Sequence, residues 1–190
     1  MQPAVFLDRD GTINLDTGYV KNPDDVKILN GVAEGIRKLK QLFGFKIVVI
    51  SNQAGVAKGL MTLNDVHLVN EKIQSLLKKE NAEIDAFYFC PFHPDFDNEE
   101  KPKCRKPSPF MIFKAAEDLM IDLNRSYLIG DRSSDIEAGI NAGVKTILLN
   151  SEIAKEELEI LNQKNVNANF IAINFLEACD FIIKDFGGNN

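Results

Sequence analysis

Short apolar segments alternate with helix-like segments along the whole chain of 190 residues, and this alternation restricts the fold more than any other feature. The segment Ile47–Ile50 is apolar at every position, which is typical of a strand that helices cover on both faces. Strands of this kind, each followed by a helix, predict a doubly wound, Rossmann-like α/β fold with a parallel sheet between helix layers.

The same patterns predict the residue ranges of the elements. Strands are expected at Ala4–Leu7, Ile47–Ile50, Ala86–Cys90, Tyr127–Ile129, Thr146–Leu149 and Phe170–Ile173. Helices are expected at Gly31–Phe43, Leu63–Asn81, Pro109–Met120, Ser134–Ala142, Ile153–Lys164 and Leu176–Asp185. Two long connections, 11–30 and 91–109, are predicted to be loops, and long loops in compact domains tend to carry function.

Length and composition indicate one globular domain over residues 1–186 and a flexible tail at 187–190. Because the N-terminus has neither a basic segment nor a long apolar stretch, we expect a cytoplasmic protein without a membrane span. The net charge of -6 offers no basic surface for nucleic acid, so locally placed cations, N–H groups or a metal must bind any phosphate. Three cysteines without an export signal predict reduced thiols, with Cys179 in the core.

Polar side chains follow the predicted strands, at the edge where parallel sheets bind ligands. These side chains belong to Asp8-Arg9-Asp10-Gly11-Thr12, Ser51-Asn52-Gln53 and Gly130-Asp131, with Asp135 beyond, and Arg105-Lys106 is added from just before the predicted helix Pro109–Met120. Asp8 and Asp10 are two residues apart in extended backbone, so both carboxylates can face one bound group. One carboxylate can attack phosphorus while the other protonates the leaving alkoxide and later deprotonates water.

Two carboxylates would repel a phosphate dianion unless a hard cation intervenes, and Mg²⁺ is the usual solution. We expect Asp131 to be a further ligand of this ion. Lys106 and the Ser51 hydroxyl would cover the charge on the phosphate oxygens, and Gly11 would allow backbone N–H groups to approach them.

Each of these features also has a purely structural interpretation. The D-x-D-G segment at Asp8 is compatible with an ordinary turn, Lys106 with a solvated charge and Asp131 with a helix cap. The location of all of them at predicted strand ends favours a common site.

The order of these segments resembles the haloacid dehalogenase superfamily of phosphatases, with matching motifs from Val5 to about Leu149. The resemblance implies that Asp8 is the nucleophile and Asp10 the general acid/base. It implies Mg²⁺ bound by Asp8, the Asp10 carbonyl and Asp131, with Asp135 in a supporting role.

Within that superfamily, the segments 51–59, 90–94 and 104–107 resemble the D-glycero-D-manno-heptose 1,7-bisphosphate phosphatases, whose nearest relatives are histidinol-phosphate phosphatases. The resemblance implies a small phosphorylated sugar as substrate, on the route to activated heptose for surface polysaccharide. Neither 13–46 nor 54–105 has room for a large cap domain, so recognition falls to loops. The substrate-binding residues that it implies are Arg9, Gly11, Thr12, Asn52, Gln53, Lys58 and Arg105.

The chain departs from the pattern of this family at a structural zinc site. Relatives commonly bind zinc through a C-x-H pair and a C-x-C pair, whereas here Phe92 and Pro102 replace two of the four ligands. Cys90, His93 and Cys104 could supply at most three ligands, and a structural zinc site normally needs four. We therefore expect a zinc-free loop with two thiols.

Three other functions are compatible with parts of the pattern. The same mechanism could act on histidinol phosphate or another small phosphomonoester, because one substitution in a pocket can shift discrimination by a few kcal/mol. A phospho-accepting signalling module also gathers an Asp, a hydroxyl and a Lys, but places its acceptor after a central strand. A catalytically inactive binding protein is disfavoured because every required group is present. We expect a monomer.

Overall fold

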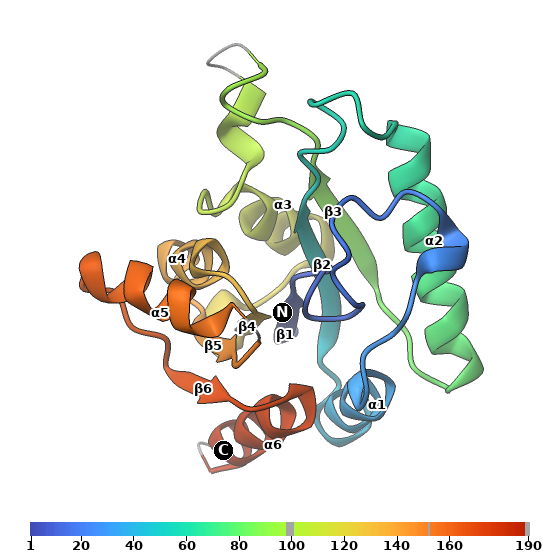
Figure 1. The fold of residues 1–190 in the computed structure, drawn as a ribbon. Helices are drawn as coiled ribbons and strands as arrows, with labels where there is room; N and C mark the ends of the chain where they lie inside the picture. The colour runs from blue at the N-terminus through green and yellow to red at the C-terminus, as the bar shows by residue number, and fades with distance from the viewer. Residues whose placement is uncertain (98–100, 152, 189–190) are drawn as a thin grey trace.

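The computed structural model describes residues 1–97, 101–151 and 153–188, and these residues form one parallel sheet flanked by helices (Figure 1). The strands are β1 (Ala4–Leu7), β2 (Lys46–Asn52), β3 (Ala86–Cys90), β4 (Tyr127–Gly130), β5 (Lys145–Leu149) and β6 (Phe170–Ala172). They are ordered β3-β2-β1-β4-β5-β6, and every neighbouring pair is parallel. The predicted doubly wound α/β fold is confirmed.

The helices form two layers, one on each face of the sheet. They are α1 (Val32–Phe43), α2 (Leu63–Lys79), α3 (Phe110–Leu119), α4 (Ser133–Ala142), α5 (Ala154–Gln163) and α6 (Phe175–Gly187). Three short 3₁₀ segments, η1 (Pro23–Asp25), η2 (Lys101–Cys104) and η3 (Leu123–Arg125), lie between them. Figure 1 shows α1, α2 and α6 on one side of the sheet and α3, α4 and α5 on the other.

The central strand β1 explains why the strand segments are apolar at every position. Val5 and Leu7 pack into the core beneath α1, α2 and α6, whereas Ala4 and Phe6 pack into the core beneath α3 and α4. All four side chains are fully buried. Because successive side chains of a strand point to opposite faces, a strand between two helix layers needs apolar residues at both parities.

Helix α2 begins where its sequence predicts a start. The Thr62 side chain accepts a hydrogen bond from the Asp65 N–H, and the Asp65 carboxylate accepts one from the Thr62 N–H. This reciprocal capping box satisfies two of the N–H groups that a helix start leaves without partners. It fixes the register of the helix, whose buried face packs against the sheet.

The C-terminal helix continues beyond its predicted end at Asp185. Phe186 packs edge-on against Phe43 and Phe45 and is buried, and this contact holds the last turn in place. Gly187 therefore belongs to α6, although the sequence predicts it as the start of a flexible tail. Of that tail, 189–190 lie outside the described residues.

Cys90 and Cys104 form a disulfide, so the prediction that all cysteines are reduced is wrong. Cys90 ends β3 and Cys104 ends η2, and the fold brings their Cα atoms to 5.5 Å, within the range that a disulfide requires. An odd cysteine count does not exclude one pair, because Cys179 remains as a free, buried thiol, as predicted.

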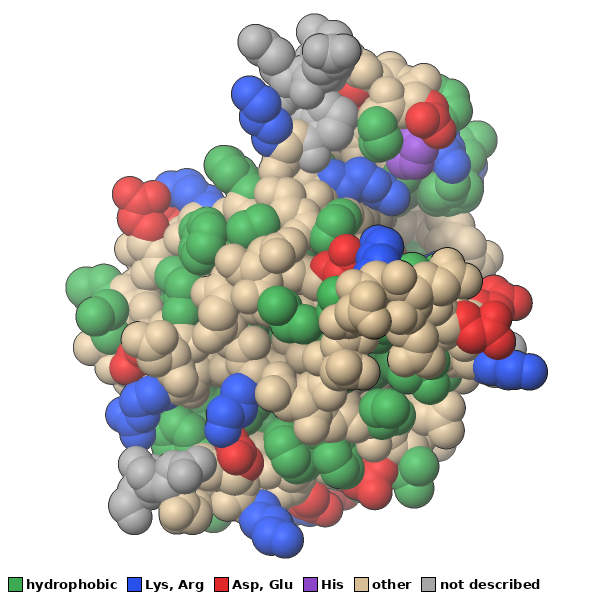
Figure 2. Space-filling view, turned by 90° about the vertical axis from the view of Figure 1, so that its left-hand side faces the viewer, with side chains coloured by type: hydrophobic (Ala, Val, Ile, Leu, Met, Phe, Trp, Pro, Cys, Tyr) green, Lys and Arg blue, Asp and Glu red, His purple; other side chains and the backbone are tan. Residues whose placement is uncertain are grey.

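The surface of the described residues carries charges of both signs. On the face seen in Figure 2, Lys and Arg side chains are interspersed with Asp and Glu and do not gather into one basic area. No helix among the described residues is both long enough and apolar enough to cross a membrane.

Ser126 provides a test of how the start of β1 is held. Its buried hydroxyl oxygen accepts the Ala4 N–H at 2.9 Å and donates to the Asp122 carbonyl at 2.6 Å. Ser126→Ala leaves the Ala4 N–H unpaired, and we expect it to lower the free energy of unfolding by about 1–3 kcal/mol. Urea titration followed by circular dichroism measures this change. The exposed Ser75→Ala should change the free energy by less than about 0.5 kcal/mol, and equal stability of the two variants would contradict the assignment.

Candidate active site

The polar residues predicted at the strand ends gather around one cavity of about 390 Å³. This cavity lies at the carboxyl ends of β1, β2 and β4. Strands β2 and β3 lie on one side of β1 and strands β4 to β6 on the other, so the direction of strand addition reverses between β1 and β4, where such sheets bind ligands. It is lined by Asp8, Asp10, Asp16, Gly18, Tyr19, Ser51, Asn52, Gln53, Ala54, Lys58, His93, Arg105, Lys106, Arg132, Ser134 and Asp135.

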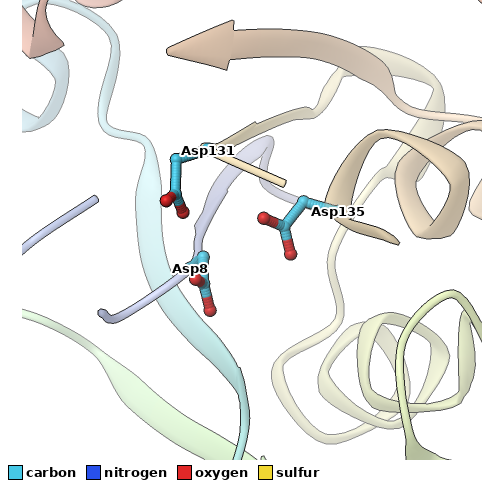
Figure 3. A group of neighbouring side chains, drawn as sticks. All are labelled: Asp8, Asp131 and Asp135. Atoms are coloured by element: carbon cyan, nitrogen blue, oxygen red, sulfur yellow. The ribbon is translucent and has the colours of Figure 1, made fainter. Parts of the chain in front are cut away.

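Three buried carboxyl groups, those of Asp8, Asp131 and Asp135, point toward one another at this edge (Figure 3). One oxygen from each lies within 4.8 Å of the others. Burial, together with repulsion by Asp135, raises the pKa of Asp8 to about 7 despite the opposing effect of Lys106. Burial and the neighbouring carboxylates raise the pKa of Asp131 to about 8.

The donor set fits a hard divalent cation. The buried Oδ1 of Asp131 has no hydrogen-bond partner among the described residues. A buried carboxylate oxygen without a partner is costly, and a cation removes the cost together with the repulsion between Asp8 and Asp131. Asp135 is already engaged, because it accepts the Arg132 N–H and lies 2.6 Å from the Lys106 ammonium.

Two glycines make room for this cluster. A Cβ at Gly11 would lie 2.3 Å from an Asp131 oxygen, and the φ of Gly11 is +86°, which side chains disfavour. A Cβ at Gly130 would lie 2.4 Å from the Asp135 side chain. The sequence predicts that Gly11 lets backbone N–H groups approach phosphate, and the structure adds a second reason for glycine there, which is the close approach of Asp131.

Lys106 lies between the acids, although it comes from a loop far along the chain. Its Nζ is 2.7 Å from Asp8 Oδ1 and 2.6 Å from Asp135 Oδ1, and it also donates to the Ile50 carbonyl. Burial opposes the charge, but Asp135 and Asp8 outweigh it and raise the pKa of Lys106. The Asn52 side chain donates to the Lys106 carbonyl at 3.1 Å and accepts its N–H at 2.9 Å, which fixes the backbone that carries the ammonium.

The Asp10 carboxylate lines the cavity and is bound by several side chains. Arg9 NH2 donates to it at 2.7 Å, Asn14 at 2.9 Å and Gln53 at 3.0 Å. Gln53 also donates to the Ser51 hydroxyl at 2.6 Å. The Gln53 amide therefore links the Asp10 carboxylate to Ser51, whose hydroxyl is predicted to bind the phosphate.

Only some of the residues predicted to bind substrate line this cavity. Asn52, Gln53, Lys58 and Arg105 line the cavity. Arg9 does not, because it is buried beneath Asp10. Gly11 and Thr12 line a neighbouring cavity of about 460 Å³, and the buried Thr12 hydroxyl has no partner within the part of the chain that the structure describes.

The rim of the cavity carries two cations. The Lys58 ammonium donates to the Tyr19 hydroxyl at 2.8 Å and lies 5.7 Å from the centre of the Phe96 ring. Burial lowers the pKa of Arg105, whose NH1 has no hydrogen-bond partner in the described ranges. Both side chains are therefore placed to meet an anionic group.

Several cavity residues were not predicted. Asp16, Gly18 and Tyr19 come from the loop at 11–30, and Arg132 pairs with Asp16 at 3.1 Å. The length of that loop indicated function, but nothing in its sequence indicated which residues would face the cavity. Arg132 and Ser134 lie inside the motif around Asp131 and could have been proposed from that position.

The three residues that could have supplied zinc ligands, Cys90, His93 and Cys104, do not form a group of ligand atoms among the described residues. Cys90 and Cys104 are bonded to each other, and a disulfide sulfur is not a thiolate ligand. His93 Nδ1 accepts the Asp95 N–H at 3.2 Å. Among the described residues, Asp8, Asp131 and Asp135 form the one group of three or more His, Cys, Asp or Glu side chains whose ligand atoms lie close enough together to bind a metal ion.

Comparison with known proteins assigns this site to a family. A HAD-hydrolase-like family model matches residues 103–178. The D-glycero-β-D-manno-heptose-1,7-bisphosphate 7-phosphatase of Helicobacter pylori is 45% identical over 77% of this chain and 82% of its own length, and that of Escherichia coli K12 is 41% identical over 77% and 78%. The chain is a HAD-family phosphatase.

The fold of this HAD phosphatase extends the similarity beyond the aligned residues. The D,D-heptose 1,7-bisphosphate phosphatase of B. bronchiseptica, solved with magnesium and phosphate, matches with a TM-score of 0.84 and 26% identity over 97% of this chain and 99% of that one. Membership makes the chain a phosphoric monoester hydrolase and disfavours the signalling module and the inactive binding protein.

The acidic cluster predicts an unusual dependence of stability on pH for the metal-free HAD phosphatase. Because the pKa values of Asp8 and Asp131 are raised, the folded protein holds protons that the unfolded chain has released above about pH 4. The contribution of these groups to stability therefore falls as pH rises from about 4 to 8. Mg²⁺ should reverse the loss and stabilise more at pH 8 than at pH 5, because it binds the ionised carboxylates.

Thermal unfolding with Mg²⁺ or with a chelator measures both effects, and Asp131→Asn is the control. The variant lacks one of the two titrating carboxyls, so its Tm should fall less steeply with pH and rise less with Mg²⁺. Identical pH and Mg²⁺ responses in the two proteins would mean that the cluster neither titrates nor binds metal as described.

Proposed function

We propose that this phosphatase removes the 7-phosphate of D-glycero-D-manno-heptose 1,7-bisphosphate through a phospho-aspartyl intermediate on Asp8. The observation that carries the proposal is the convergence of Asp8, Asp10 and Lys106 in one cavity of a chain 45% identical to a phosphatase of that name. A second anionic group on the substrate suits the cations at the cavity rim.

The chemistry follows from the roles of two carboxylates. An Asp8 oxygen attacks phosphorus and the ester P–O bond breaks, while Asp10 gives its proton to the leaving sugar oxygen. Water then attacks the phosphorus of the acyl phosphate, Asp10 takes the proton, and inorganic phosphate leaves with Asp8 regenerated. Lys106 and the Ser51 hydroxyl neutralise and orient the phosphoryl oxygens during both steps.

Asp8, the Asp10 carbonyl and Asp131 would bind Mg²⁺, with Asp135 supporting them through Lys106 and the Arg132 N–H. Bound Mg²⁺ supplies positive charge that lets an anionic phosphate approach anionic carboxylates. The Asp131 oxygen that lacks a hydrogen-bond partner in the described part of the chain supports this assignment, as does the magnesium in the B. bronchiseptica enzyme.

The rim cations favour a bisphosphate over histidinol phosphate. Lys58 and Arg105 both line the cavity, and the guanidinium of Arg105 has a nitrogen left to donate. Histidinol phosphate would bring an amine to this end of the cavity, where like charges are costly. We therefore propose that Arg105 and Lys58 bind the second phosphate or the sugar.

A phosphate-release assay with Mg²⁺ tests the reaction and the substrate. We expect one equivalent of phosphate from the heptose bisphosphate, at least about tenfold lower kcat/KM for histidinol phosphate, and none above background with Asp8→Asn. The matched control is Asp180→Asn, an exposed carboxylate on α6, which should keep full activity. Faster hydrolysis of histidinol phosphate would reassign the substrate, and full activity in Asp8→Asn would overturn the mechanism.

Arg105→Ala tests recognition of the second phosphate. A charge-assisted hydrogen bond contributes about 1.5–3 kcal/mol, so kcat/KM for the bisphosphate should fall about 10- to 100-fold. The heptose 7-monophosphate lacks the second phosphate and should lose much less, and the exposed Lys72→Ala serves as the charge control. An unchanged kcat/KM for the bisphosphate would show that Arg105 does not contact this substrate.

A further inference from the structure

Arg9 is the largest fully buried side chain of the described residues, although it stands between the two aspartates of the site. A guanidinium buried in a protein is costly unless its donors find partners. Its Nε donates to Asp10 Oδ1 at 3.1 Å and its NH2 to Asp10 Oδ2 at 2.7 Å. Arg9 therefore makes a bidentate contact with the Asp10 carboxylate, and this contact fixes the plane of the carboxylate.

Two further N–H groups of Arg9 are bound by two amide side chains. NH2 donates to Gln53 Oε1 at 3.0 Å, and NH1 donates to Asn70 Oδ1 at 3.2 Å. Because the Gln53 oxygen faces Arg9, the Gln53 nitrogen faces Asp10 and Ser51. The orientation of the Gln53 amide thus depends on Arg9 staying where it is.

Asn70 belongs to none of the motifs that make up the site. It lies on α2, 61 residues from Arg9, and the other buried residues of that helix are Val66, Val69, Ile73 and Leu77. A polar side chain on an otherwise apolar helix face is destabilising unless it is hydrogen-bonded. The partner of Asn70 is the Arg9 guanidinium. The buried face of α2 therefore carries a hydrogen-bond acceptor at the position that contacts Arg9.

We propose that Asn70 is a positioning residue for the general acid: it anchors Arg9, and Arg9 with Gln53 directs the Asp10 carboxyl toward the leaving oxygen of the substrate. The inference rests on the general-acid role proposed for Asp10. Proton transfer requires the donor within hydrogen-bond reach of the leaving oxygen, so a small displacement of Asp10 slows it sharply. Attack by Asp8 involves this network only through the hydrogen bond from Gln53 to the Ser51 hydroxyl, whereas Asp10 is bound by both Arg9 and Gln53.

The leaving group of the substrate separates positioning from folding. An alkyl phosphate needs a proton on its leaving oxygen, whereas p-nitrophenyl phosphate releases a stable phenolate without one. Loss of a correctly placed acid should therefore lower kcat/KM for the alkyl ester and spare the aryl ester. The ratio kcat/KM reports the first chemical step, which is the step that differs between the two esters.

The test is Asn70→Leu, which removes the acceptor and keeps the branched shape and the number of heavy atoms of the side chain. We expect kcat/KM to fall about 10- to 100-fold for the heptose bisphosphate and for glycerol phosphate, and by less than about threefold for p-nitrophenyl phosphate. Asn70→Asp retains an oxygen acceptor and should recover most of the alkyl-ester activity. Equal losses on both ester classes, or no loss on either, would overturn the proposal.

Gln74→Leu is the matched control on the same helix. Gln74 binds both the N–H and the carbonyl of Ile84 and makes no contact with Arg9 or Asp10, so its loss should lower Tm and leave the ratio of the two rates unchanged. If the wild-type protein hydrolysed glycerol phosphate but not the heptose bisphosphate, the proposed substrate would be wrong. The comparison of glycerol phosphate with p-nitrophenyl phosphate would still test the role of Asn70.

Discussion

Three carboxyl groups, those of Asp8, Asp131 and Asp135, meet around the single ammonium of Lys106 in a region from which water is largely excluded. Like charges so close together in a poorly solvated site oppose folding unless protons, cations or hydrogen bonds compensate them. Lys106 compensates two of the acids, and the third, Asp131, keeps an oxygen for which the described residues offer no hydrogen-bond partner. Burial, together with repulsion among these acids, raises the pKa values of Asp8 and Asp131, and the same conditions make the site receptive to a divalent ion and an anionic phosphate.

The topology makes this arrangement possible. Strand β1 lies at the centre of the sheet, with β2 and β4 beside it, so the residues after three strands reach one point although they are distant in sequence. Side-chain amides then set the finer geometry: Asn52 holds the backbone of Lys106, and Gln53 connects Asp10 with Ser51. Neutral amides suit this role because they can donate and accept without adding charge to a crowded electrostatic site.

The success of prediction from sequence varied with the range of the interactions involved. Strands and helices followed from local periodicity, the candidate residues Asp8 and Ser51 followed from their places at strand ends, and Lys106 followed from its place before a predicted helix. The family resemblance implies Arg9 as a substrate-binding residue, yet the fold buries Arg9 away from the cavity and places it in a network with Asn70. The Cys90–Cys104 pairing and the contact of Tyr19 with Lys58 also escaped prediction, because they depend on contacts between segments separated in sequence.

The sequence by itself determined the layered α/β architecture, since apolar strands of both parities can only be buried between two helix layers. It also determined the kinds of chemical group available for phosphoryl transfer. Only the tertiary structure decided which of them face the cavity, which support them from behind and how their charges balance. The physical reason is that burial, distance and hydrogen-bond geometry arise from residues tens of positions apart, such as Asp8 and Lys106, and no local pattern encodes them.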